Sequence, residues 1–138
     1  MTFELHPQLA SDTLPVASLA LSELLLMNDA RFPWCILVPR RPDVREWHHL
    51  SEADLLQVMR EVSVVSEALE TLPGTSKLNV GALGNRVTQL HIHVVARHPD
   101  DDAWPDPVWG FGSASAYADD AAAALVRLLR EAVADQTA

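Results

Sequence analysis

The chain has 138 residues, of which 49% are hydrophobic and 21% are charged, and its net charge at pH 7 is -9. This length fits one globular unit with its own core, so we expect a single domain over residues 1–138. The acidic balance argues against a nucleic-acid polymer as partner, because such binding needs a basic surface. It does not exclude a small anionic ligand in a pocket whose charge differs from the average.

No secretion or membrane signal is visible in the sequence. The opening residues, MTFELHPQL, lack a basic stretch followed by an apolar one. No apolar run approaches the ~20 residues that a membrane helix needs. Cys35 is the one cysteine, so it cannot form an internal disulfide, and we expect it to be buried. These features predict a cytoplasmic protein without a membrane partner.

The first half of the chain predicts short strands followed by a long helix. Residues 3–13 indicate a strand or turn leading into a helical piece, and residues 14–29 indicate two short strands that end at the turn formers Asn28 and Asp29. Residues 34–39 are an apolar run typical of a buried strand, and a polar loop follows. Ser51 then begins a helix whose apolar residues recur at helical spacing until Pro73-Gly74. That stripe comprises Leu55, Met59, Val62, Val65, Leu69 and Leu72.

The second half predicts two more strands, a loop and a final helix. Residues 76–97 indicate strand, turn and strand, with the turn at Gly84-Asn85 and a long second strand over about residues 87–97. A proline-rich acidic loop with Trp104 and Trp109 follows. Residues 116–134 indicate an amphipathic helix with an apolar stripe of Leu125, Leu128, Leu129 and Val133. We therefore expect an α+β fold, an antiparallel sheet of about five strands with one long central helix and a C-terminal helix.

The stretch QLHIHVV, residues 89–95, places two imidazoles on one face of a strand. Since strand side chains alternate, Gln89, His91, His93 and Val95 point one way, and the two histidines lie about 7 Å apart. The intervening residues are all apolar, which supports this register. Three interpretations stay open. The rings are structural, or they bind zinc with a third ligand that no spacing identifies, or one ring attacks phosphorus while the other handles charge.

The segment LNVGALGNRVTQLHIHVVAR resembles the histidine triad superfamily of nucleotide hydrolases and transferases. Its signature is His-φ-His-φ-His-φ-φ, with φ apolar, preceded by an asparagine and a Gly-Gln turn. The match covers residues 79–95, and a looser match reaches back through LLLMNDARFPWCILVPRR. The resemblance implies a fold of this type, a homodimer, and transfer of a nucleotidyl group through a covalent nucleotidyl-histidine. It implies neither a cofactor nor a metal.

The resemblance also implies roles for particular residues. His91 matches the nucleophile, which the family aims through a hydrogen bond to the carbonyl of the first motif residue, here Gln89. His93 matches the residue that contacts a phosphate oxygen. The implied substrate-binding residues are Asn79, Asn85, Arg86, Gln89, Asn28 and Asp29. Asn28 and Asp29 match ribose contacts, and ordinary turn chemistry is their alternative. The implied substrate is a dinucleoside polyphosphate, a nucleoside phosphoramidate or an adenylated small molecule.

Two departures motivate a rival interpretation. Gln89 stands where the motif has its first histidine, and Trp34 stands where many members have a histidine upstream. A tryptophan there could wall off the site or alter the substrates. A non-catalytic nucleotide-binding module of the same family is therefore the alternative function. Trp104 and Trp109 are candidates for substrate choice, with buried packing as their alternative.

Overall fold

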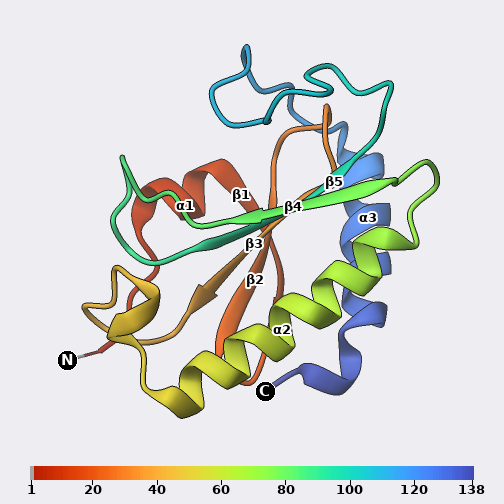
Figure 1. The fold of residues 1–138 in the computed structure, drawn as a ribbon. Coiled ribbons are helices and arrows are strands. Elements are labelled where there is room, and N and C mark those ends of the chain that lie inside the picture. The colour runs from red at the N-terminus through yellow and green to blue at the C-terminus, as the bar shows by residue number, and fades with distance from the viewer. Residues whose placement is uncertain (1) are drawn as a thin grey trace.

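The computed structural model describes residues 2–138, which form one antiparallel sheet with helices against it (Figure 1). The strands are β1 (Thr13–Ser18), β2 (Ser22–Met27), β3 (Trp34–Pro39), β4 (Lys77–Gly81) and β5 (Ile92–Arg97). Their order across the sheet is β1-β2-β3-β5-β4, so β5 is a central strand and β4 lies at an edge. This arrangement confirms the predicted α+β fold.

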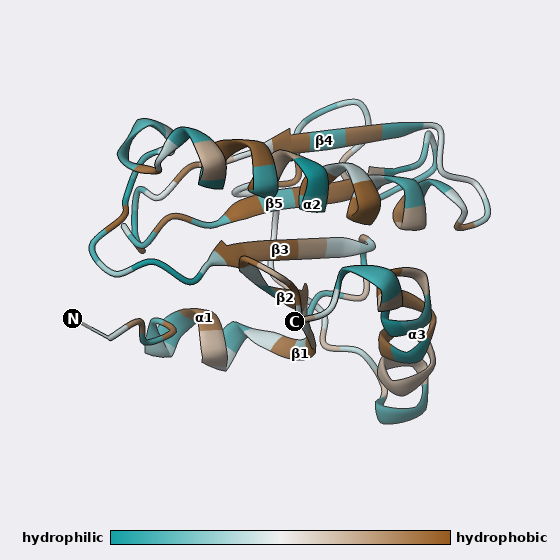
Figure 2. Ribbon diagram, turned by 90° about the horizontal axis from the view of Figure 1, so that it is seen from below, coloured by the Kyte–Doolittle hydropathy of each residue, from teal (hydrophilic) through white to brown (hydrophobic). Residues whose placement is uncertain are grey.

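One face of the sheet is covered by the two long helices, α2 (Glu52–Glu70) and α3 (Asp119–Ala132). Val62, Val65 and Leu69 of α2 pack against Ile92 and Val94 of β5, which are fully buried. Figure 2 shows the same layers from below. Helix α2 has both hydrophobic and hydrophilic segments, and β3 is hydrophobic along much of its length. Burial of alternate strand residues beneath the helices is the main force holding these layers together.

The opposite face carries the short helix α1 (Pro7–Asp12) and the irregular segment that follows β5. Its core includes Trp34 and Ile36 of β3, Val95 of β5, and Ala103 and Val108 of the irregular segment. His93 belongs to this face, since it pairs with Ile36 on one side and with Gly81 on the other. The histidines therefore lie on the side away from α2, as strand alternation predicts.

A buried carboxylate joins α2 to the turn between β1 and β2. Glu61 is fully buried, and its side chain accepts hydrogen bonds from the main-chain N–H groups of Leu21 (2.8 Å) and Ser22 (3.0 Å). Gln57 donates a third bond at 3.2 Å. The carboxylate thus satisfies turn donors that the sheet leaves without partners. The apolar stripe predicted for this helix did not include Glu61.

The structure corrects three details of the predicted elements. The second strand of the hairpin begins at Ile92, not near residue 87, because residues 82–91 leave the sheet: Gly84 has a φ of 71°, and the Leu90 N–H bonds to the carbonyl of Val44. Met59 and Leu128 are 51% and 39% exposed, so neither belongs to the core face of its helix. No helix within residues 2–138 is both long and apolar enough to span a bilayer.

Candidate functional site

His91 and His93 bring two imidazoles together at the start of β5. His91 immediately precedes the strand and His93 is its second residue. Their ring centroids lie 4.9 Å apart at an interplanar angle of 65°, and the two residues are only 7% and 5% exposed. Neither Nε2 atom has a hydrogen-bond partner among the described residues, and neither is among the buried polar atoms that lack one. Both Nε2 atoms therefore reach the solvent-accessible surface.

The ring of His91 is aimed by the main chain. Its Nδ1 lies 2.7 Å from the carbonyl oxygen of Gln89. A carbonyl can only accept, so Nδ1 carries the proton, and Nε2 of the neutral ring holds a lone pair. His91 also lines a recess of about 10 Å³ with Arg45 and Gly84, among others. This recess has room for about one water molecule, so a larger ligand requires it to widen.

Two tryptophans enclose His93. Trp34 lies on the neighbouring strand β3, two residues before the direct partner of His93, and its indole Nε1 is 2.9 Å from the His93 Nδ1. Trp109 meets the His93 ring edge to face, with centroids 5.5 Å apart, and its own Nε1 is buried without a partner in the described part of the chain. Burial, followed by repulsion from the charge of His91, lowers the pKa of His93 to about 3.

The Gln89 side chain points away from the His91 ring nitrogens and toward the N-terminal segment. Its Oε1 accepts from the main-chain N–H of His6 at 2.9 Å, and its Nε2 donates to the carbonyl of Glu4 at 2.8 Å. The first motif position thus contributes its main-chain carbonyl to the site and its side chain to the fold.

Asn28 and Asp29 line a cavity of about 410 Å³ together with Trp34, whose indole also contacts His93. Both side chains also hold neighbouring loops. Asn28 Oδ1 accepts from the N–H of Tyr117 at 2.9 Å, and Asp29 forms a two-pronged ion pair with Arg31, the shortest contact being 2.7 Å. Burial opposes ionisation of Asp29, but its bonds from Arg31 and Ser115 outweigh burial and lower its pKa.

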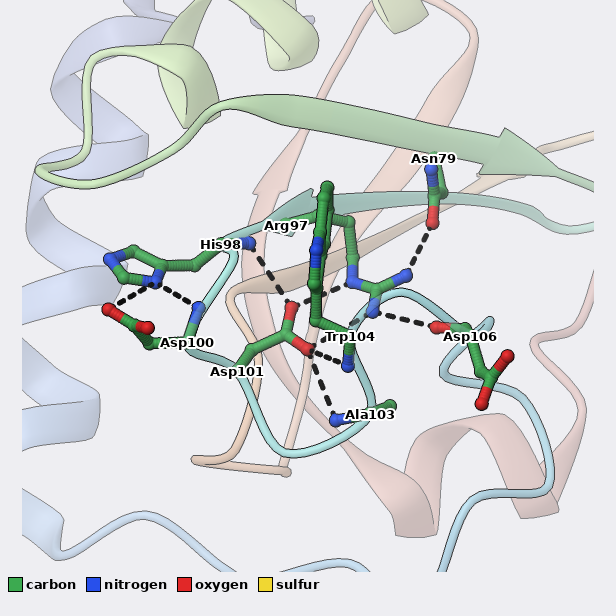
Figure 3. A network of polar contacts seen from close by, with 8 residues as sticks. All are labelled: Asn79, Arg97, His98, Asp100, Asp101, Ala103, Trp104 and Asp106. Atoms are coloured by element: carbon green, nitrogen blue, oxygen red, sulfur yellow. Dashed lines mark hydrogen bonds and ion pairs between the residues drawn. The ribbon is translucent and has the colours of Figure 1, made fainter.

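Asn79 belongs to a buried network around Arg97, which is 2% exposed (Figure 3). Nη1 of Arg97 donates to Asn79 Oδ1 at 2.7 Å, and its Nε donates to Asp101 at 2.8 Å. The guanidinium also lies 5.5 Å from the ring centre of Trp104. Asn79 is thereby fixed on the histidine face, where it pairs with Val95. No role was predicted for Arg97, although strand alternation from His93 places residue 97 on the histidine face.

Asn85 and Arg86 lie apart from these contacts. Both are exposed in the loop before β5, and within residues 2–138 neither side chain forms a hydrogen bond or ion pair. Among the same residues, no three His, Cys, Asp or Glu side chains are grouped as metal ligands. The structure thus gathers His91, His93 and Asn79 on one face, and Asn28 and Asp29 line a cavity with Trp34.

An α+β fold with two adjacent imidazoles at the start of a central strand is typical of the histidine triad class. Residues 10–100 match the model of the HIT domain family. The chain belongs to this family, whose members are nucleotide-binding hydrolases and transferases.

Solved structures of histidine triad proteins superpose over nearly the whole chain. One from Bradyrhizobium japonicum is 42% identical with a TM-score of 0.94, covering 96% of this chain and 99% of that one. One from Sinorhizobium meliloti is also 42% identical, with a TM-score of 0.91 and coverage of 94% and 96%. One from Marinobacter aquaeolei is 39% identical, with a TM-score of 0.96 and coverage of 99% and 100%. No curated protein matches the chain.

Proposed function

We propose that this protein is a nucleotide hydrolase or nucleotidyl transferase that works through a covalent nucleotidyl-His91 intermediate. The observation that carries the proposal is the 2.7 Å contact between His91 Nδ1 and the carbonyl of Gln89. It holds the proton on Nδ1 and leaves a lone pair on Nε2, which is the form that attacks phosphorus. Because the acceptor is a main-chain carbonyl, a glutamine in the first motif position keeps the His91 ring in the same orientation.

The reaction proceeds in two displacements at the α-phosphorus. In the first, the Nε2 lone pair of His91 forms a bond to phosphorus while the bond from phosphorus to the leaving group breaks. The Nδ1–H bond to Gln89 then stabilises the positive charge on the ring. In the second, water attacks phosphorus, the P–N bond returns its electrons to Nε2, and the water proton passes to solvent. Donors fixed near the phosphate oxygens, with His93 as the nearest, stabilise the developing charge.

The substrate is a nucleoside phosphate derivative: a dinucleoside polyphosphate, a phosphoramidate or an adenylated small molecule. Asn28 and Asp29 line the cavity that we assign to the nucleoside, which Trp34 also lines. Asn79 contacts the phosphate or leaving group, and Gln89 takes part through its carbonyl. We assign exposed Arg86 to a longer phosphate chain and exposed Asn85 to a phosphate oxygen.

The alternative is a module of the same family that binds nucleotides without turnover. The enclosure of His93 by Trp34 and Trp109 favours it, as does the small size of the recess at His91. Mixing the protein with diadenosine polyphosphate or adenosine phosphoramidate, and measuring AMP, separates the two. AMP release that disappears in His91→Ala but persists in His48→Ala supports the enzyme. Binding without AMP release in all three proteins supports the module.

We also propose a cytoplasmic homodimer of this domain, residues 1–138. β4 is an edge strand with Val80 47% exposed, and Leu83 beyond it is 45% exposed. On α2, Leu56 and Met59 are 59% and 51% exposed. An unpaired strand edge and exposed apolar side chains suit a symmetric contact with a second copy. Light scattering after size exclusion tests this: a dimeric mass that falls to a monomeric one in Val80→Lys supports it, and a monomeric wild type contradicts it.

A further inference from the structure

The contact between Trp34 and His93 fixes which nitrogen of His93 carries a proton. An indole Nε1–H can donate a hydrogen bond but cannot accept one. The His93 Nδ1, 2.9 Å away, must therefore accept. An imidazole that accepts at Nδ1 is neutral and has its proton on Nε2, which is the atom that reaches the surface. His91 and His93 are thus held in opposite tautomers.

The surroundings of His93 disfavour both the tautomer with its proton on Nδ1 and the doubly protonated, charged ring. A proton on Nδ1 would face the indole N–H and leave two buried donors without an acceptor, which disfavours that form by about tenfold or more. Across the sheet, His93 faces Ile36 and Gly81, and Trp109 packs against its ring. In the described chain, His91 is the titratable side chain in contact with the His93 ring, and a proton on His91 would oppose a second positive charge on His93.

We propose that Trp34 is a positioning residue that holds His93 neutral with its proton on Nε2, so that the site offers a nucleophile and a hydrogen-bond donor but no general acid. A neutral imidazole gives up its remaining proton only with great difficulty, and Trp34 cannot supply another to Nδ1. This inference rests on the proposed function and narrows its substrates: it favours leaving groups that depart as anions.

The bond changes show why the leaving group matters. When a phosphate or carboxylate leaves, the P–O electrons stay on its oxygen, which is stable as an anion and needs no proton. When a basic amine leaves a phosphoramidate, the P–N electrons need a proton on nitrogen, and no group on the His93 side donates one. Since general acid catalysis contributes about 10²–10⁴-fold, phosphoramidates lose a factor of this order relative to anhydrides.

The protonation state is tested directly by ¹⁵N NMR of the histidine rings in the free protein. The expected wild-type spectrum has His93 Nδ1 unprotonated and Nε2 protonated at pH 7. Trp34→Phe keeps an aromatic ring but removes the donor, and it shifts His93 toward a mixture of tautomers. Trp109→Phe is the matched control. It removes an indole N–H that lies beside the same ring but has no partner within residues 2–138, and it leaves the tautomer unchanged. A protonated Nδ1 in wild type, or an unchanged tautomer in Trp34→Phe, overturns the proposal.

The leaving-group preference is tested by the ratio of AMP release from a diadenosine polyphosphate to that from adenosine phosphoramidate. Wild type favours the anhydride by about 10²-fold or more, and Trp34→His, which restores a ring that can carry a proton, narrows the ratio by about tenfold or more. Equal rates in wild type, or a ratio that Trp34→His does not change, overturn the preference. Absence of turnover with both substrates overturns the proposed function and the preference with it, while the NMR spectrum still decides the role of Trp34.

Discussion

The side chain of Gln89 and the main chain of His6 are joined by a 2.9 Å hydrogen bond, although 83 positions separate them in the sequence. The same side chain donates to Glu4, so it holds the N-terminal segment at two points. The carbonyl of Gln89 meanwhile lies 2.7 Å from His91 Nδ1. One residue therefore orients the His91 ring through its main-chain carbonyl and holds residues 4–6 through its side-chain amide.

Gln89→Ala is predicted to release the N-terminal segment. Loss of two hydrogen bonds of about 1 kcal/mol each speeds amide hydrogen exchange at His6 by up to about thirtyfold, because local opening becomes easier. Thr88→Ala, in the exposed neighbouring residue, serves as control and leaves the exchange rate of His6 unchanged. Equal exchange in Gln89→Ala and wild type would show that the two hydrogen bonds do not hold the segment.

Glu61→Ala is predicted to destabilise the fold by about 2–4 kcal/mol, because it leaves the buried N–H groups of Leu21 and Ser22 without acceptors. Urea unfolding measures the loss. Glu67→Ala, on the same helix but exposed, is the matched control and is predicted to change stability by less than about 0.5 kcal/mol. Similar losses in the two variants would contradict a special role for Glu61.

Asp101→Asn is predicted to cost about 3 kcal/mol, because it leaves the buried guanidinium of Arg97 without its counter-charge. The exposed neighbour provides the control variant, Asp102→Asn, which is nearly neutral. Burial opposes ionisation of Asp101, but the bonds from Arg97, His98 and Trp104 outweigh it and lower its pKa to about 2. This contribution is complete above about pH 4 and is lost as the pH falls toward 2. An Asp101→Asn variant as stable as wild type at pH 7 would refute it.

As the pH falls, His93 is predicted to destabilise the fold at a higher pH than Asp101 does. In the unfolded chain this ring takes up a proton below its ordinary pKa of 6.5, whereas in the folded protein its pKa is about 3. Stability is therefore complete above pH 6.5 and declines as the pH falls from 6.5 toward 3. The free energy of unfolding, followed by urea titration over this range, is steeper in wild type than in His93→Gln. Parallel curves would show that His93 is not buried as a neutral ring.

Much of the fold follows from local patterns in the sequence. Alternation placed His91 and His93 on one face, and helical spacing placed Val62, Val65 and Leu69 in the core. The start of β5 was predicted too early because residues 87–91 alternate like a strand. They lie outside the sheet, and the Leu90 N–H bonds to the carbonyl of Val44 instead. Alternation reports a preference for burial on one side, and it does not report whether a neighbouring strand is present.

The contacts within the site were less predictable. Neither Glu61 nor Arg97 was predicted to be buried, since charged side chains are rarely buried without partners. The main-chain partners of Glu61 lie 39 and 40 positions away, and the partners of Arg97 lie on β4 and in the irregular segment after β5. The pairing of Trp34 with His93 depends on the register between β3 and β5, which no local pattern specifies. The roles of Asn79, Asn85, Arg86, Asn28 and Asp29 toward a substrate stay predictions.

The most direct test of the proposed mechanism is mass spectrometry of the protein quenched in alkali, which preserves P–N bonds, during reaction with a diadenosine polyphosphate. The mechanism predicts an added AMP on the peptide that contains His91, and none in His91→Ala. AMP release by wild type without any adduct on that peptide, or an adduct that persists in His91→Ala, would contradict nucleophilic attack by His91.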